Sequence, residues 1–407
     1  MERDELTAWL RLALTPSVGN DTARRLLAAF GLPQAVFDQG AAARRPLLTP
    51  AQASALAEPP EGLDAQVQAT ADWLAAAEPG QGRALVTLGD ARYPAALLAI
   101  EDPPLMLYLL GQVHLLDSEP NRPPALAGQA QAAIETEANG WPARALAMVG
   151  SRNPTPQGAQ NARQFAQALA GAGLTVVSGL ALGVDGAAHE GALAACDDSA
   201  PAARLATLAV VGTGLDRVYP RQHRALAHRI AAQGLIVSEY PLGTPPLAGN
   251  FPKRNRLIAG LARGTLVVEA ALQSGSLITA RLASEQGKEV FAIPGSIHSP
   301  QSRGCHALIR QGAKLVETAE DVLEELRWPQ VATSTIAASA SQSSAGGRNS
   351  DESALLQALG ADPVSLDALL ARTGLDTATL QARLLDLELD GQVGRLPGGL
   401  FQRLGRG

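Results

Sequence analysis

The chain has 407 residues, of which 46% are hydrophobic, and this length and composition predict about two or three domains with sizeable cores. No apolar run approaches the roughly 18 to 20 residues of a membrane-spanning helix, and the charged start Met1–Glu5 does not resemble a secretory signal, so we expect a cytoplasmic protein without membrane partners. Two cysteines, Cys196 and Cys305, are too few for a disulfide framework and lack zinc-site spacing, so we expect no metal.

The net charge of −6 is unevenly distributed along the chain. Residues 1–146 carry 10 basic and 17 acidic side chains, whereas residues 147–328 carry 17 basic and 14 acidic ones. Residues 351–407 are acidic again, with 5 basic against 8 acidic side chains. Only the central part is therefore expected to bind a polyanion such as a nucleic acid.

Residues 1–111 are rich in Ala and Leu and predict a small helical domain with a connector. Within it, residues 14–27 have the pattern of two helices joined by a short glycine turn, as in SAM or helix-hairpin-helix units. Such a turn can hold a DNA backbone, but its acidic surroundings favour a packing or interaction role. Residues 112–143 are rich in Pro, Ala and Gln with little periodicity, so we interpret them as an insertion or linker.

Residues 144–328 repeat one unit, in which an apolar run is followed by a glycine-containing turn and then a helical pattern. The predicted strands are 145–149, 175–178, 205–211, 235–239, 265–269 and 289–293. The predicted helices are 157–172, 184–195, 222–233, 254–261 and 277–285. This alternation predicts an extended Rossmann-like α/β domain with a parallel sheet that helices cover on both faces.

Glycine- or serine-rich turns follow most of these strands, at residues 150–152, 179–183, 212–214 and 274–276. Because such turns lie at the carboxyl ends of the strands, we expect them to meet at one crevice of an open sheet. The segment 250–256 places Lys253, Arg254 and Arg256 close together at the start of a helix, behind Pro252. This cluster indicates a phosphate-binding edge, and the alternative is a solvated basic helix start.

Residues 329–350 have the Ala, Ser and Gly composition of a flexible linker. Three helical patterns and a hairpin follow within residues 351–407, and together they predict a winged-helix domain. Its third helix carries Asp386, Glu388 and Asp390, which would repel phosphate. We therefore expect a protein-interaction or structural role for this domain.

The ordered motifs of the central domain closely resemble those of the DNA processing protein A family, DprA or Smf. They are Met148–Arg152, Val177–Ala181 with Gly183–Asp185, Gly212–Asp216 with Tyr219–Pro220, Ser238–Pro241, Asn250–Arg256, Val268–Ala270, Ser274–Arg281 and Ile293–Ser296. Leu182 departs from the pattern, because many relatives have Arg or Lys at this position of the turn.

This resemblance implies a single-stranded DNA-binding protein of natural transformation. Such a protein protects incoming strands and helps to load the RecA recombinase without catalysing a reaction, and it forms a homodimer through its Rossmann-like domain. The resemblance assigns DNA contacts to seven residues: Gly150, Ser151, Arg152, Lys253, Arg254, Asn255 and Arg256.

The residues themselves add further candidates to this site. Gly179 belongs to the glycine turns, and Phe251 is a candidate stacking platform whose alternative role is core packing. Backbone donors at Ser274, Gly275 and Ser276 could bind an anion, or these residues could cap a helix. Four side-chain contacts to phosphates would give a log–log salt slope near −3.

Two other classes of function stay open. A nucleotide-binding enzyme of the phosphoribohydrolase kind would share the fold, but no G-x-G-x-x-G follows Val149 and no P-loop occurs. Glu239 and Glu269 end strands and could be catalytic carboxylates, yet nothing in the sequence shows that they face each other. His189 follows Asp185 by four residues, one helical turn, which can form a small polar network as readily as an acid–base pair, so we assign no catalytic residue and no cofactor. The third class is a scaffold that holds protein partners without DNA.

Overall fold

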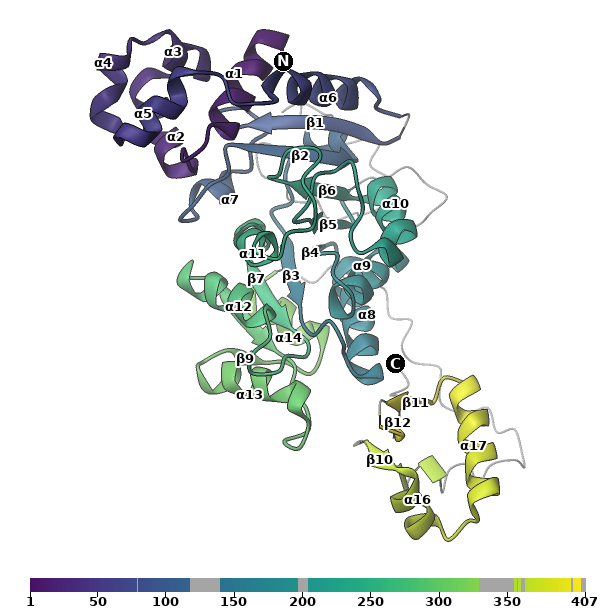
Figure 1. Ribbon diagram of the computed structural model, residues 1–407. Coiled ribbons are helices and arrows are strands. Elements are labelled where there is room, and N and C mark those ends of the chain that lie inside the picture. Colours follow the sequence, from purple (N-terminus) through teal and green to yellow (C-terminus); the bar gives the residue numbers. More distant parts are fainter. Residues whose placement is uncertain are drawn as a thin grey trace, which may run out of the picture.

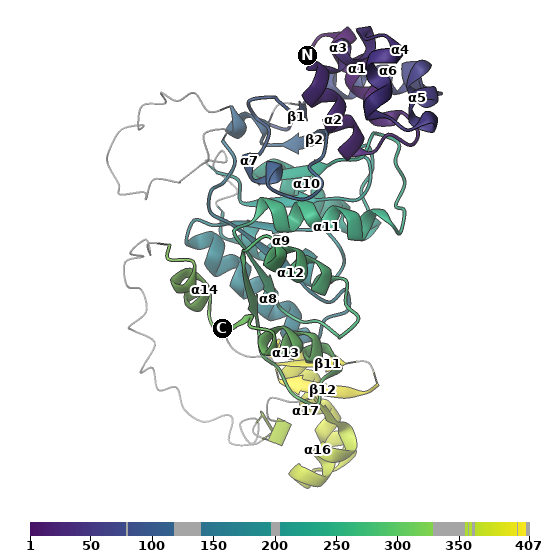
Figure 2. The same cartoon turned by 90° about the vertical axis from the view of Figure 1, so that its left-hand side faces the viewer.

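The computed structural model describes residues 1–78, 80–117, 140–196, 204–328, 355–356, 358–359, 363–396 and 398–403. The predicted linker at 329–350, and most of the predicted insertion at 112–143, lie outside these residues. The described chain forms an N-terminal helical part, a central α/β part and a small C-terminal domain, and Figure 2 shows the first and last of these at opposite ends of the molecule.

The N-terminal part is helical, as predicted. It contains α1 (Arg3–Leu14), α2 (Asn20–Phe30), α3 (Pro33–Asp38), α4 (Ala41–Arg44), η1 (Arg45–Leu47), α5 (Pro50–Ala57) and α6 (Leu63–Ala75). Trp9, Leu10, Leu26 and Leu56 form the fully buried centre of this part. Burial of each of these side chains stabilises the fold by about 1.5–3 kcal/mol. The apolar contacts among the helices therefore stabilise a domain that has little regular hydrogen bonding between its elements.

A nine-stranded sheet forms the middle of the molecule (Figure 1). Its strands are β1 (Gly82–Thr87), β2 (Met106–Gly111), β3 (Ala145–Val149), β4 (Thr175–Ser178), β5 (Thr207–Val210), β6 (Leu235–Ser238), β7 (Gly264–Val267), β8 (Glu289–Ala292) and β9 (Lys314–Leu315). They lie in the order β1-β2-β6-β5-β4-β3-β7-β8-β9. The seven strands from β6 to β9 in this order are parallel, which confirms the predicted α/β core.

The first two strands of this sheet were not predicted. Residues 82–111 were expected to belong to the helical domain and its connector, whereas the structure pairs β1 with β2 and β2 with β6, in both cases antiparallel. Leu85 and Tyr108 pack with the N-terminal helices, and Val86 and Leu107 pack on the other face. Because both faces are buried, the strands read as continuous apolar runs without a polar alternation.

The central strands also bury both of their faces. Along β3, Ala145, Ala147 and Val149 point towards α11 (Asn250–Leu261), and Leu146 and Met148 point the other way. Figure 1 shows β3 between α11 on one side and α8 and α9 on the other. The other described helices of the central part are α7 (Ala95–Leu98), η2 (Val113–Leu116), α8 (Pro156–Gly171), α9 (Val184–Ala194), η3 (Arg221–His223), α10 (Arg224–Gln233), α12 (Ser276–Glu285), η4 (Pro300–Ser302), α13 (Arg303–Arg310) and α14 (Ala319–Glu325).

The C-terminal domain has the predicted winged-helix fold. It contains α16 (Leu366–Thr373), α17 (Thr377–Leu389) and a sheet of β10 (Val364–Ser365), β12 (Leu400–Arg403) and β11 (Val393–Leu396), in which β11 and β12 form the wing hairpin and contact α8. Ser365 and Asp376 accept N–H groups of the first turns of α16 and α17, as their N-cap positions predicted. Asp386 and Glu388 are exposed on α17, and Asp390 is exposed directly after its end.

Candidate nucleic-acid interface

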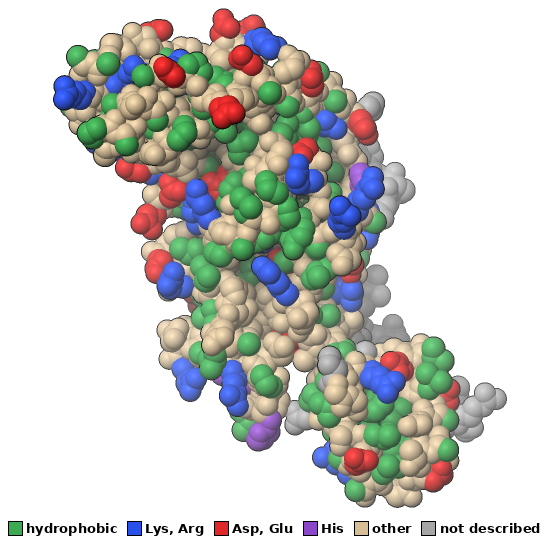
Figure 3. All heavy atoms as spheres, in the orientation of Figure 1, with side chains coloured by type: hydrophobic (Ala, Val, Ile, Leu, Met, Phe, Trp, Pro, Cys, Tyr) green, Lys and Arg blue, Asp and Glu red, His purple; other side chains and the backbone are tan. Residues whose placement is uncertain are grey.

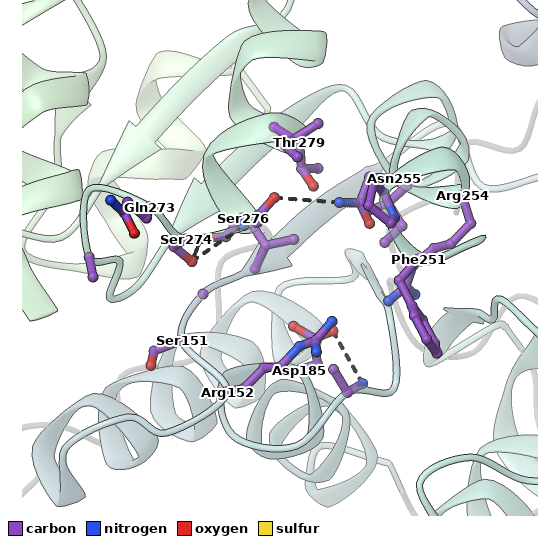
Figure 4. Close-up of a pocket in the computed structure, with 18 of the residues that line it drawn as sticks. Ser151, Arg152, Asp185, Phe251, Arg254, Asn255, Gln273, Ser274, Ser276 and Thr279 are labelled. Atoms are coloured by element: carbon purple, nitrogen blue, oxygen red, sulfur yellow. Dashed lines mark hydrogen bonds between the residues drawn. The ribbon is translucent and has the colours of Figure 1, made fainter. Parts of the chain in front are cut away.

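A cavity of about 480 Å³, the central cavity, opens where β3 and β7 end (Figure 4). This is the edge at which ligands bind in open α/β sheets. Nine of the twelve residues predicted for DNA binding line it: Gly150, Ser151, Arg152, Phe251, Arg254, Asn255, Ser274, Gly275 and Ser276. Figure 4 shows residues 274–276, which we call the serine loop, on one side of the cavity and the turn with Ser151 and Arg152 on the other.

A smaller cavity of about 80 Å³, the side cavity, adjoins the central one. The two share Arg152, Phe251 and Arg254, and the side cavity adds Gly179 and Tyr219. Ten of the twelve predicted residues therefore line one cavity or the other. The glycine turns converge as the sheet topology predicted.

Lys253 and Arg256 line neither cavity. The Lys253 side chain is exposed to solvent. The Arg256 guanidinium donates to both carboxylate oxygens of Glu239, over 2.7 and 2.5 Å, and to the carbonyl oxygen of Asp102 over 2.9 Å. Only 11% of the Arg256 side chain and 6% of the Glu239 side chain are exposed. This geometry gives Arg256 a structural role, and its DNA contact stays a prediction.

Arg254 supplies a buried positive charge beneath the central cavity, with only 4% of the residue exposed. Its guanidinium donates to the carbonyl oxygen of Val210, and its Nε–H has no acceptor among the described residues. Burial lowers the pKa of Arg254, and the nearby carboxylate of Asp185 opposes that shift. Burial also raises the pKa of Asp185. Since charges interact more strongly away from water, this cation can attract an anion that enters the cavity.

Two glycines allow these groups to approach closely. A side chain at Gly179 would overlap the Arg254 guanidinium, so only glycine leaves room for it there. Gly183 has φ of +81°, which glycine adopts readily, and a side chain there would overlap the carbonyl oxygen of Ser151. The glycine turns thus bring the loops after β3 and β4 against each other.

The serine loop leads into the N-terminus of α12. Ser274 Oγ lies 2.7 Å from Ser276 Oγ and accepts the Ser276 N–H over a long 3.4 Å. Asn255 donates to the carbonyl oxygen of Gly275 over 3.4 Å, which links α11 to this loop. The next two N–H groups of α12 also have partners in this loop, because Leu277 donates to the carbonyl oxygen of Ser274 and Ile278 to that of Gly275, each over 3.1 Å. The N-terminus of α12 can therefore attract an anion mainly through the partial positive charge of the helix dipole.

An aromatic pair lies at the rim of the side cavity. The ring centroids of Phe251 and Tyr219 are 5.5 Å apart, and the Arg152 guanidinium lies 5.7 Å from the Phe251 centroid. Tyr219 is 47% exposed. Phe251 was predicted as a stacking platform, whereas Tyr219 belongs to a motif of the family resemblance and was not predicted to contact DNA. In the sequence, the position of Tyr219 after the turn at 212–214 is the feature that could have indicated a role at the site. Only the fold brings Tyr219 into contact with Phe251.

The carboxylates that an enzyme could use have structural partners. Glu239 is held by Arg256. Glu269 accepts the backbone N–H of Thr155 over 2.9 Å and its hydroxyl over 2.5 Å, which fixes the turn between β3 and α8. His189 Nδ1 bonds to the Thr207 hydroxyl over 2.7 Å, so the described contacts do not pair it with Asp185. The described residues also contain no cluster of three metal-ligating side chains.

Two family models match the sequence. One, described as DNA recombination-mediator protein A, matches residues 137–327, and one for the DprA winged helix domain matches residues 338–399. Protein Smf of Escherichia coli is 41% identical over 319 residues, which span 77% of this chain and 75% of that protein. The chain belongs to the DprA/Smf family. It therefore has a DNA-processing role.

Two solved structures of DprA proteins are similar to this chain, and the first of them agrees with this assignment. The X-ray structure of DNA processing protein A from Streptococcus pneumoniae superposes with a TM-score of 0.60 at 33% identity and covers 80% of this chain and 98% of that one. A structure from Helicobacter pylori, described by its single-stranded DNA binding mode, has a TM-score of 0.47 at 31% identity and covers 60% of this chain and 95% of that one. The match to the first of these supports the fold over most of the chain.

The Arg256–Glu239 ion pair predicts a stability difference between neighbouring basic residues. Arg256→Ala leaves the Glu239 carboxylate buried and unpaired, which costs about 3–5 kcal/mol, so we expect the Tm to fall by about 10 °C. Lys253→Ala removes an equal charge from the solvent-exposed side of the same helix and should leave the Tm within about 2 °C. Thermal denaturation of both variants measures the difference. Equal Tm values would refute the structural role of Arg256.

His189 predicts a pH dependence of stability. Burial first, and then repulsion by His223 and Arg254, lower the pKa of His189 to about 3. In the unfolded chain this histidine protonates near pH 6.5, so the folded state should lose about 1.4 kcal/mol for each pH unit below that value. Above pH 6.5 both states are neutral and the contribution is constant.

The variant His189→Gln isolates this contribution, because the other titrating groups are unchanged. Between pH 7.5 and pH 5 the Tm of the wild type should fall by about 5 °C more than that of the variant. Thermal denaturation at the two pH values measures both falls. If the Tm of the wild type and that of the variant fall equally, the prediction that His189 is buried in its neutral form is wrong.

Proposed function

We propose that this protein binds single-stranded DNA at the central cavity. In natural transformation it would protect incoming strands and help to load the RecA recombinase without catalysing a reaction. The observation that carries the proposal is the convergence of Arg152, Arg254 and the N-terminus of α12 at one cavity with an aromatic rim. Cations and the positive end of a helix dipole attract phosphate, and aromatic rings stack on the faces of bases.

The aromatic rim favours a single strand over a duplex. Phe251 and Tyr219 can stack only on base faces that are exposed, and a duplex buries those faces between its base pairs. The described site offers few other aromatic rings, in keeping with an aromatic content of 3% in the whole chain. Phosphate contacts therefore supply most of the affinity, with little preference for sequence.

A nucleotide-processing enzyme is the weaker alternative, because Glu239 and Glu269 already have structural partners. We further propose that the protein is cytoplasmic and acts as a homodimer. Two central cavities on one strand would raise the affinity through effective concentration. Sedimentation at increasing protein concentration measures the oligomeric state.

Fluorescence anisotropy with a labelled single strand of about six nucleotides tests the DNA site. Arg152→Ala removes an exposed cation of the cavity and should weaken binding at least about tenfold. The wild-type salt slope should be about −1.4, since two arginines line the cavity, and should fall to about −0.7 in the variant. The slope near −3 expected from the sequence assumed four side-chain contacts to phosphates, whereas Lys253 and Arg256 lie outside the cavity.

Arg310→Ala is the matched control, because Arg310 is an exposed arginine of α13 outside both cavities. It should bind within about twofold of the wild type. A duplex competitor should displace the strand poorly. Binding that is insensitive to salt and to Arg152→Ala would reject the DNA site, and tight binding of RecA in the absence of DNA would then favour a scaffold.

A further inference from the structure

The loop that follows β5 lies between two cavities. Residues 211–213, Tyr219 and Pro220 line the side cavity, whereas residues 215–218 and Arg221 line a separate groove of about 730 Å³. One short loop therefore separates the proposed DNA site from this second groove. A chain that crosses the loop at Tyr219 reaches the groove without leaving the surface.

We call this second site the arginine groove after the residues that line it: Arg83, Arg217, Arg221 and Arg224, together with His228. Arg83 comes from β1, whereas the other residues come from one continuous segment that comprises the loop after β5, η3 and α10. Figure 3 shows basic side chains and a histidine gathered on this side of the molecule, over α10.

The arginine groove has an excess of positive charge. Arg217 is neutralised by Asp216 over 2.7 Å, and Asp216 also accepts the N–H of Gly243 over 2.8 Å. Glu78 is the other acidic residue of the lining. Among the described residues, the side chains of Arg221 and Arg224 make no ion pair or hydrogen bond, and both are exposed.

Arg83 holds a fixed position at the opposite wall. It donates to the carbonyl oxygen of Trp73 over 2.9 Å, and its guanidinium lies 5.4 Å from the centroid of the Trp73 ring. Its buried Nε–H has no acceptor among the described residues. A buried donor without a partner is costly, so an acceptor that enters the groove would gain from pairing with it.

The floor between these cations is apolar and includes Leu110, Leu215, Val218 and Ile236. A groove with cationic walls and an apolar floor suits a flexible polyanion that also carries flat apolar faces, which describes single-stranded nucleic acid. An acidic protein segment would also match the charge. Continuity with the side cavity across Tyr219 favours the nucleic acid.

We propose that the arginine groove holds the phosphates of the same single strand, after the strand has crossed the Phe251–Tyr219 pair from the central cavity. This extends the binding site to a second segment of the strand and rests on the proposed function. Arg221 and Arg224 contact phosphates there, and Arg83 forms the far wall. Short strands fill only the central cavity, whereas long strands use both sites.

Anisotropy titrations with oligothymidylates of about 6 and about 30 nucleotides test this division. The double variant Arg221→Gln/Arg224→Gln should bind the short strand within about twofold of the wild type and the long strand about tenfold more weakly. The wild-type salt slope should steepen by about 1.4 from the short to the long strand, and the variant should lack this change.

The matched control is Arg229→Gln/Arg310→Gln, which removes the same charge from exposed arginines outside the groove. It should bind both strands within about twofold of the wild type. Both double variants change exposed side chains, and a Tm within about 2 °C of the wild type checks their folding.

The outcomes separate the two proposals. If Arg152→Ala binds the short strand as well as the wild type does, the proposed function fails. If the short strand depends on Arg152 but the long strand does not respond to Arg221→Gln/Arg224→Gln, only the groove proposal is overturned. Equal weakening of short and long strands by that variant also overturns it. In both of these cases an acidic protein segment becomes the candidate occupant.

Discussion

The buried ion pair between Arg256 and Glu239 sets the position of α11, on which the site depends. Successive residues of a helix turn by about 100°, so Arg254 and Arg256 point to nearly opposite sides. Once Arg256 is held by Glu239 and Asp102, Arg254 can only lie under the central cavity. Phe251, one turn earlier, then reaches the rim beside Tyr219. One structural charge pair thereby orients the residues that face the ligand.

The site concentrates positive potential in a chain of net charge −6. It does so with few cations, because Arg254 acts from a buried position and the N-terminus of α12 adds the positive end of a helix dipole. The carboxylate of Asp185 lies near Arg254 and moderates its charge. The acidic N-terminal helices and the acidic α17 lie at the two ends of the molecule, so electrostatic repulsion confines a nucleic acid to the central part.

Much of the central fold could be predicted because parallel strands and their turns leave strong local signals. The glycine turns marked the crevice correctly, since each follows a strand in the sequence. The sequence could not distinguish the basic residues of 250–256 that face the cavity from those with a structural role. The helix begins at Asn250 rather than at Arg254, and it therefore distributes its basic side chains around its axis. Tyr219 contributes through a contact with Phe251 that spans 32 positions of the sequence, and no local pattern encodes such a pairing. The strands β1 and β2 were missed because their two buried faces remove the polar alternation.

These two unpredicted strands also change what the molecule can bind. β1 carries Arg83, and β2 carries Leu110, so the edge that they add to the sheet supplies one wall and part of the floor of the arginine groove. Without them α10 would present Arg224 to open solvent, where an exposed cation gives little affinity. With them the same arginine faces a second cation across a groove. Because β1 and β2 extend the parallel sheet, the outer surface of a nucleotide-binding type of fold becomes part of a continuous path for a single strand of DNA.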